Sequence, residues 1–360
     1  MDVGLPELAQ PAQRGARMVA LRLLDEANEA APKVLEGNDD EALHDFRVAI
    51  RRLRSWARAF DSELDDAIGK KSKRRLKALA SATNPARDRQ VHRAWLRDAA
   101  ERSRGARRDA AQWLERYFDS DDDDDRDDLV DTVHDDFPKV RDTLARALAK
   151  DMATVDVPAD VFAPPVPTLA AGIADRIGPH LVALEEATTH IHTMGDEAAA
   201  HAARIAAKQL RYLIEPARDV EGGGALLKRL RALQDALGEL HDAHVMAHEL
   251  GGVLKDAAKA EARRTTARIL GRALVPADPD DKTYASFPYD GVVSLMRKLR
   301  ADIHATFETA QRRFTGPAAQ ALRHEAEALE ARLRVPHPRA EAAETAPAEA
   351  PVAEANDLPA

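Results

Sequence analysis

Apolar residues recur at intervals of three and four along most of the chain, with polar residues between them. This spacing is typical of amphipathic helices, so the sequence predicts an all-α fold. Short polar links that contain Gly, Pro or Asp separate the periodic segments. We expect helices over residues 12–36, 41–60, 64–83, 87–117, 128–150, 168–193, 197–218, 224–238, 241–272 and 288–334.

The chain has 360 residues, which is enough for two helical bundles of ordinary size. A proline-rich link at 156–168 is the predicted boundary between them. The first bundle then spans 12–155, after an N-terminal extension at 1–11, and the second spans 169–335. The tail at 336–360 is rich in Ala, Glu and Pro, and we expect it to be disordered because it has few large apolar groups to bury.

Composition agrees with close helix packing through small side chains, because 44% of residues are hydrophobic but only 4% are aromatic. The chain has no cysteine, which excludes disulfides and thiolate metal sites and favours a reducing cytoplasm. No segment approaches the ~20 apolar residues of a membrane helix, and the N-terminus lacks an apolar run typical of a signal peptide. We therefore expect a cytoplasmic protein that makes no membrane contact.

The net charge of −9 is unevenly distributed. Residues 119–128 hold eight Asp and one Arg, which predicts a solvated acidic loop, whereas residues 44–77 hold eleven Lys and Arg against five Asp and Glu. Local fields attract ligands even where the average charge has the opposite sign. The basic segments therefore indicate a partner that the net charge alone would exclude, namely a polyanion.

Two sets of basic residues, which we call the basic stripes, share spacings of 3, 4 and 3. They are His44, Arg47, Arg51 and Arg54 in the first half, and His201, Arg204, Lys208 and Arg211 in the second. Later blocks also correspond: Arg74, Arg75 and Lys77 with Lys228, Arg229 and Arg231, and Asn84 and Asp88 with Gly238 and Asp242. This order predicts an internal repeat, and we interpret it as two similar antiparallel bundles related by a pseudo-two-fold axis.

The first basic stripe lies beside the apolar face of its helix. At ~100° per residue, positions 44, 47, 51, 54 and 58 span about 80°, centred about 110° from the apolar set. A fully solvated face would lie opposite the core, so this position predicts side chains that line a central groove. Arg52 falls outside the stripe and is expected to be ordinary surface. Like charges at these spacings repel each other, and phosphate is the anion that best matches arginine.

The sequence resembles the CHAD (conserved histidine α-helical domain) family over about residues 12–320. The resemblance rests on LHDFRVAIRRLRSWARAF at 43–60 and HAARIAAKQLRYLIEPA at 201–217, with NPARDRQV at 84–91 and LGELHDAHV at 237–245. It implies two four-helix bundles around a basic channel that binds inorganic polyphosphate, often on polyphosphate granules. The residues that it assigns to binding are the two basic stripes and, with a looser register, Lys73, Arg74, Lys77, Lys228, Arg229 and Arg231. The second half has His241 where the first has Arg87, which puts equal ligand contact there in doubt.

Two other functions stay open. Nucleic acid could bind the same stripes, although Tyr212 and Trp56 are the only nearby aromatic residues for base stacking. A metal-dependent phosphohydrolase is the other, because His244 and His248 have the i, i+4 spacing of helical metal ligands and follow His241. The chain has no H-E-x-x-H motif, P-loop or nucleophile elbow. We therefore predict binding without catalysis and assign no cofactor.

Overall fold

The structure, a computed structural model, describes residues 5–36, 40–119, 129–150, 166–271, 275 and 280–335. The fold is all-α, as the sequence predicted, and the described residues form no strand beyond an isolated bridge between Pro11 and Thr168. Within these ranges, none of the helices is both long and apolar enough to span a membrane. Most of the predicted link and all of the predicted tail lie outside the described residues, as does the acidic run from 120 to 128.

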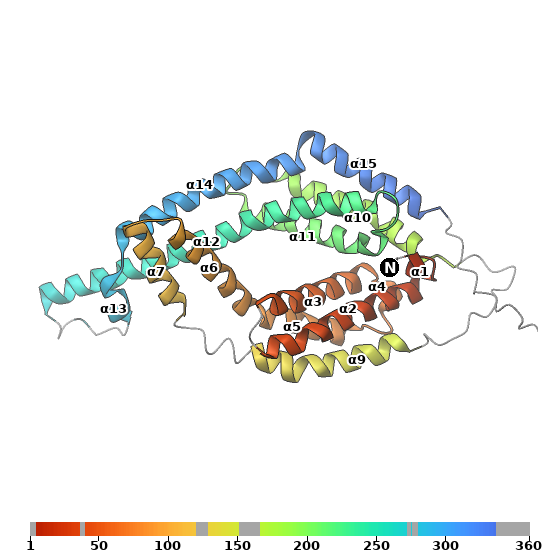
Figure 1. Cartoon of the computed structure of the whole chain (residues 1–360), viewed down its shortest axis with the longest axis horizontal. Helices are drawn as coiled ribbons and strands as arrows, with labels where there is room; N and C mark the ends of the chain where they lie inside the picture. The colour runs from red at the N-terminus through yellow and green to blue at the C-terminus, as the bar shows by residue number, and fades with distance from the viewer. Residues whose placement is uncertain are drawn as a thin grey trace, which may run out of the picture.

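Four helices of the first half form one bundle (Figure 1). They are α2 (Ala12–Glu36), α3 (Asp40–Ala59), α5 (Lys70–Ala82) and α9 (Phe137–Ala149), with the short α1 (Leu5–Leu8), α4 (Asp61–Leu64) and a π-helical turn at Thr132–Asp136 beside them. The rings of Phe46 and Phe137 meet edge to face at 5.0 Å in its core. The Trp56 indole is fully buried and donates a hydrogen bond of 2.9 Å to the Ala16 carbonyl. These contacts fix α3 against α2 and α9.

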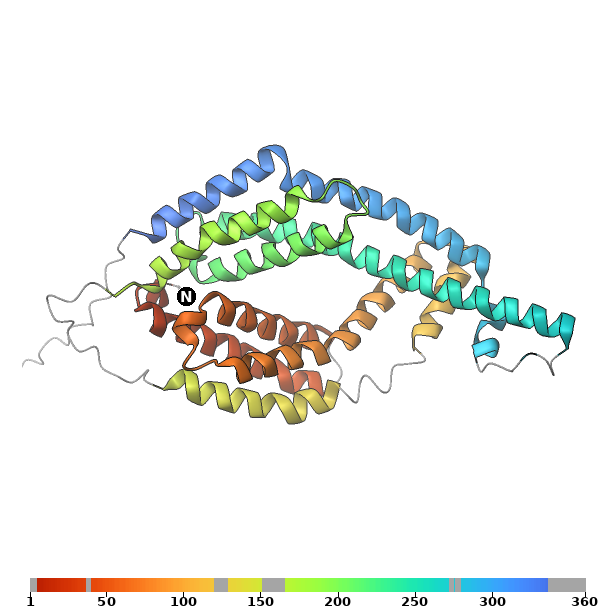
Figure 2. The same cartoon turned by 180° about the vertical axis from the view of Figure 1, so that it is seen from behind.

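A second bundle consists of helices from the second half of the chain (Figure 2). Its members are α10 (Leu169–Thr189), α11 (Glu197–Ile214, followed by the 3-10 turn Glu215–Ala217), the first part of α12 (Gly223–Leu270), and α15 (Gly316–Leu333). Ala200, Ala203 and Ala207 of α11 are buried, and their small side chains let neighbouring helices approach closely.

Beyond this bundle, α12 continues alongside α14 (Tyr289–Phe314) (Figure 1). A hairpin from the first half, α6 (Asn84–Glu101) and α7 (Ala106–Asp119), packs against α14 through α7. Gly291 of α14 permits the contact with α7, because a Cβ there would lie 2.1 Å from the Ala106 carbonyl oxygen. The Tyr117 and Tyr284 hydroxyls are 2.8 Å apart, joining α7 to the turn at Tyr284–Ser286, which follows the short α13 (Asp280–Thr283). The hairpin therefore ties the two halves together.

Several predicted helix boundaries were wrong. The predicted helices at 87–117 and 288–334 are each broken in two, and a glycine with a positive φ of 55° lies at each break: Gly105 directly before α7, and Gly316 after the extended Thr315 at the start of α15. The predicted helix at 64–83 begins only at Lys70, whereas the helices predicted at 224–238 and 241–272 are continuous as α12. The internal repeat, its pseudo-two-fold axis and the domain boundaries stay predictions.

Candidate functional site

Helices α3 and α11 face each other between the two bundles (Figure 2), and a hollow of about 540 Å³, which we call the groove, lies between them. Seven cationic side chains line the groove: Arg47, Arg51, Arg54 and Arg58 from α3, Arg87 from α6, and Arg204 and Lys208 from α11. Three histidines, His44, His201 and His241, join them, and among the described residues Asp88 and Asp242 are the only carboxylates in the lining.

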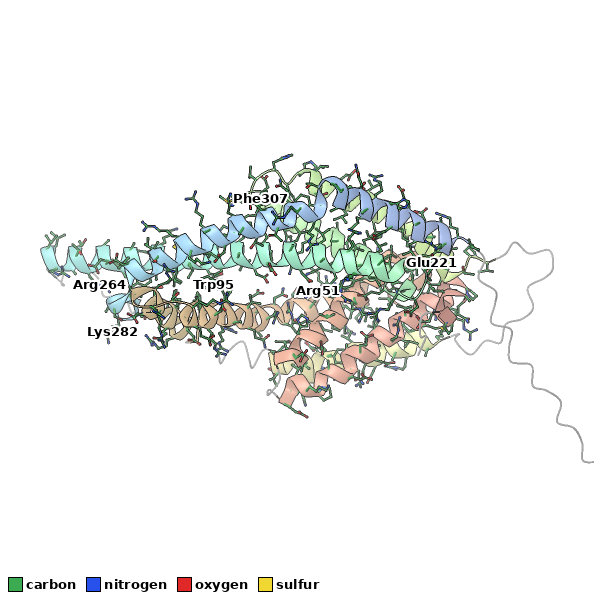
Figure 3. All side chains as sticks on the ribbon, turned by 45° about the horizontal axis from the view of Figure 1, so that its top comes forward. Arg51, Trp95, Glu221, Arg264, Lys282 and Phe307 are labelled. Atoms are coloured by element: carbon green, nitrogen blue, oxygen red, sulfur yellow. The ribbon has the colours of Figure 1, made fainter. Side chains whose placement is uncertain are left out.

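One wall of the groove is the polar face of α3. The apolar residues of this helix, among them Ile50 and Leu53, are buried in the first bundle, which leaves the arginines beside them at the bundle surface. Figure 3 shows Arg51 on the side of α3 that faces the second bundle. Arg47 is held in place by hydrogen bonds from its guanidinium to the Thr83 hydroxyl (2.7 Å) and the Asn84 amide oxygen (3.0 Å). The turn between α5 and α6 therefore orients the first arginine of the row.

The opposite wall comes from α11 and the adjoining part of α12. The Nε of Arg204 is buried, and no described residue accepts a hydrogen bond from it. Gly238 of α12 lies close to this guanidinium, since a Cβ at that position would be 3.7 Å from the Arg204 Nε. The rings of His201 and His241 lie with their centroids 4.9 Å apart and tilted by 41°. This wall thus presents donors that are held close together and incompletely bonded.

Burial and mutual repulsion lower the pKa of groups on both walls. The pKa of Lys208 falls to about 7, first because the ammonium is buried and then because of the charges of Arg204 and Arg51. Burial, followed by the charge of Arg51, lowers the pKa of Arg47 to about 10. Burial and the charge of Arg204 lower the pKa of His241 to about 4. The groove therefore disfavours its own positive charge when no anion is bound.

The histidines of the basic stripes respond in the same way. Burial lowers the pKa of His44, and Arg87 lowers it further. Burial and then Arg204 lower the pKa of His201. Both imidazoles therefore favour the neutral form, in which one ring nitrogen can donate a hydrogen bond to an anion.

Among the described residues, none of the seven groove cations forms an ion pair with a carboxylate. The charge of Asp88 raises the pKa of Arg47, and the charge of Asp242 raises that of Arg204, but burial outweighs each effect. A surface arginine commonly finds an acidic neighbour, and a buried unpaired charge is costly. The arrangement is suited to binding several anionic groups in a row.

The groove contains seven of the eight residues of the basic stripes. The exception is Arg211, whose guanidinium lies 4.7 Å over the Tyr212 ring and 3.7 Å from a Glu215 carboxylate oxygen. Of the residues assigned with a looser register, Lys73, Arg74 and Lys77 line a neighbouring hollow. Lys228, Arg229 and Arg231 do not line either hollow, and Arg229 instead pairs with Glu325 of α15 at 2.6 Å.

Three further groove residues were not among the predicted binding residues. Arg58 continues the spacing of the first basic stripe by four residues, so the signal was present in the sequence. Arg87 and His241, which correspond in the predicted repeat, both line the groove despite their different chemistry. The expectation for Arg52 was wrong: it pairs with Glu26 of α2 at 2.5 Å and with Glu215 at 2.6 Å, and so joins the two bundles.

The three histidines considered as metal ligands, His241, His244 and His248, have different surroundings. The His244 Nε2 lies 2.9 Å from the Met194 carbonyl oxygen, and the His248 Nε2 lies 2.8 Å from a Glu197 carboxylate oxygen. His241 instead lines the groove. In the part of the chain that the structure describes, no three His, Cys, Asp or Glu side chains are placed to hold one metal ion together.

Comparison with known proteins places the chain in a family. The family model of the CHAD domain matches residues 19–251, which is more than half of the chain. The crystal structure of the CHAD domain from the plant Ricinus communis superposes with a TM-score of 0.59 at 20% identity, covering 84% of this chain and 92% of that one, and so shows the same fold. No curated protein matches the sequence. The chain therefore belongs to the CHAD family.

Proposed function

We propose that the groove binds inorganic polyphosphate and that the protein does not hydrolyse it. The proposal rests on one observation above all. Cations from two facing helices lie together in one groove, several with their pKa lowered by burial, and no described carboxylate forms an ion pair with them. An anion that enters the groove would supply the negative charge that the cations lack. It would also accept hydrogen bonds from donors without a partner, such as the buried Arg204 Nε.

A chain of phosphates suits this groove better than a single phosphate. The row from Arg47 to Arg58 extends over eleven residues of α3, or about 16 Å at the helical rise. A single phosphate would contact only part of that row, whereas a linear polyanion places a charge near each successive cation. Guanidinium groups bind phosphate oxygens in pairs, and Lys208 adds a compact charge on the facing wall.

Nucleic acid is the weaker candidate for the same groove. Non-specific binding of single strands relies on bases that stack on aromatic side chains, at about 1–3 kcal/mol per base. Among the described residues that line the groove, Tyr212 is the only Phe, Tyr or Trp. Trp56, the other aromatic residue near the first basic stripe, is fully buried in the first bundle. The lining favours a polyanion without bases.

The absence of catalysis is part of the proposal. The two groove carboxylates, Asp88 and Asp242, act on neighbouring cations, since their charges raise the pKa of Arg47 and of Lys208 respectively. This is a role in holding the charged forms of binding residues, and it requires no proton transfer to a substrate. The family resemblance extends the proposal to cytoplasmic polyphosphate granules, which co-sedimentation of the protein with granules tests.

A titration of the whole chain tests the proposed function. Long polyphosphate, tripolyphosphate and single-stranded DNA are compared at several salt concentrations, with and without Mg²⁺, and released orthophosphate is measured. We expect affinity that rises with polyphosphate length and falls steeply with salt, as counterion release requires, and no orthophosphate release. Equal affinity for single-stranded DNA would favour nucleic-acid binding, and Mg²⁺-dependent orthophosphate release would favour a phosphohydrolase.

A further inference from the structure

A second hollow adjoins the groove at the end of α3. It measures about 320 Å³ and lies between the end of α3 and the start of α5. Arg54 and Arg58 line both the groove and this second hollow, which we call the α5 hollow. The two spaces therefore share side chains and form one continuous basic surface around the end of α3.

The α5 hollow is almost as cationic as the groove. Its lining includes five basic side chains, Arg54, Arg58, Lys73, Arg74 and Lys77, and one carboxylate, Asp61. That carboxylate is paired with Lys73. No ion pair joins Arg74 or Lys77 to a carboxylate among the described residues. The α5 hollow thus repeats the feature on which the proposed function rests, which is a set of neighbouring cations with too few acids.

The shared arginines connect the two spaces electrostatically. Burial lowers the pKa of Arg54, and the charges of Arg58 and Arg51 lower it further. Along α3, Arg54 thus lies between Arg51, which lines the groove, and Arg58, which lines both the groove and the α5 hollow. An anion bound to Arg54 and Arg58 would face the groove on one side and the α5 hollow on the other.

The corresponding residues of the second half do not form such an extension. Arg229 is engaged by Glu325 of α15 through two hydrogen bonds, of 3.0 and 2.6 Å. Lys228 and Arg231 are exposed on α12 and line neither space. The basic surface therefore continues out of the groove over α5, whereas the corresponding cations at the start of α12 line neither of these two spaces.

We propose that a polyphosphate chain longer than the groove leaves it over the end of α3, and that the α5 hollow binds its next phosphates. The proposal deepens the proposed function and rests on it. It makes binding directional with respect to the protein, because the described residues that form the extension all come from the first half. It also gives long chains an affinity advantage that chains confined to the groove lack.

Charge reversal in the α5 hollow tests this proposal. The variant Arg74→Glu with Lys77→Glu is compared with Lys70→Glu with Lys71→Glu, an equal charge change at exposed positions of the same helix that do not line the hollow. Tripolyphosphate and a chain of tens of phosphates are titrated into each protein. For the hollow variant we expect at least a tenfold loss of affinity for the long chain and less than about a twofold change for tripolyphosphate. Its salt dependence should lose about two units of slope, one for each contact removed.

Each outcome decides between the two proposals. Equal losses for long and short chains, or the same loss in the control variant, would overturn the α5 hollow as a specific extension. Failure of the unmodified protein to bind polyphosphate of any length would instead remove the proposed function itself. Circular dichroism and thermal unfolding monitor the fold, and if the charge reversal lowers the helicity, Arg74→Gln with Lys77→Gln tests the same side chains without introducing acids.

Discussion

Lys208 of α11 and Arg51 of α3 lie on opposite walls of the groove, and the charge of Arg51 contributes to the lowered pKa of Lys208. Burial of the ammonium is the largest cause, followed by Arg204 and then Arg51, and together they bring this pKa from 10.5 to about 7. A lysine that is half deprotonated near neutral pH binds an anion weakly. A bound anion stabilises the ammonium form, so the lysine takes up a proton from solvent when the anion binds. Protons and polyanion are therefore coupled at this residue.

This coupling predicts that polyphosphate binding weakens as the pH rises above about 7. A bound polyanion favours charged Lys208 and raises its pKa, so binding takes up a proton at any pH between the free and bound values. The loss approaches tenfold per pH unit if one proton is involved. Isothermal titration between pH 6 and 9, in buffers of different ionisation enthalpy, measures both the affinity and the proton uptake. Lys208→Arg should bind with a flatter pH profile, and an unchanged profile in this variant would contradict the assignment.

Stability of the free protein should change with pH in the opposite direction. The folded pKa of Lys208 lies below its unfolded value, so the unfolded chain binds more protons between pH 7 and 10.5, and stability rises with pH across that window. Lys208→Met should stabilise the free protein by on the order of 1 kcal/mol at pH 6, because it removes a buried, unpaired charge. Denaturant unfolding at pH 6 and 10 measures the difference, which should shrink at the higher pH. The same variant should bind polyphosphate more weakly.

Reversing one charge on each wall should abolish binding. Arg51→Glu with Lys208→Glu places two carboxylates among the remaining groove cations, and we expect no measurable affinity for polyphosphate while helicity is retained. The matched control is Lys70→Glu with Lys71→Glu, which changes the net charge equally at exposed positions outside the groove. Affinity that persists in the first variant would exclude the groove as the site. A comparable loss in the control would indicate a general effect of charge.

The residues of this site that share one helix could be predicted from the sequence. The spacing of His44, Arg47, Arg51 and Arg54 places them on one helix face, and the apolar residues beside them fix which face is buried. The same reasoning identified most of the second stripe. Periodicity also predicted where α2 begins and ends, because its apolar positions and its boundaries are encoded within one continuous segment.

Ion-pair partners that lie far apart in the sequence could not be predicted from it. Arg229 fits the basic pattern, but Glu325 engages it, and no local rule shows that α15 brings Glu325 to α12. The pair of Arg211 with Glu215, by contrast, has the i, i+4 spacing that a helix pattern predicts. Arg52 lies outside the basic stripe, and only tertiary packing reveals its partners: Glu26 from α2 of the same bundle and Glu215 from the second bundle. A helix pattern specifies which face a residue occupies, whereas tertiary packing decides which charge it meets.

Removing Arg52 should weaken the contact between the bundles without removing the binding site. Its guanidinium donates to Glu26 of α2 and to Glu215 after α11, and all three side chains are partly buried. We expect Arg52→Ala to destabilise the protein by about 1–3 kcal/mol, because two carboxylates lose a charged partner. Polyphosphate affinity should stay within about threefold at a temperature where the variant is folded. Denaturant unfolding and titration together measure this, and a large affinity loss with unchanged stability would instead indicate that Arg52 contacts the ligand.

Arg17 offers the sharpest test of what holds the first bundle together. It is only 4% exposed, and its Nη1 donates to the carbonyl of Lys150 at 2.5 Å and, more weakly, to those of Ala147 and Leu148 at 3.4 and 3.5 Å. These carbonyls at the end of α9 lack helical partners, so Arg17 acts as a cap supplied by another helix. Its Nη2 also pairs with Asp66, which is about half exposed.

Two substitutions separate these roles of Arg17. We expect Arg17→Met to cost about 2–4 kcal/mol, because it leaves buried and partly buried carbonyls without donors. Asp66→Asn should cost no more than about 1 kcal/mol, because the exposed carboxylate contributes little to a pair that water screens. Denaturant unfolding measures both, and hydrogen exchange should show faster exchange in α9 for Arg17→Met alone. Equal losses of stability in the two variants would assign the effect to the ion pair and not to the cap.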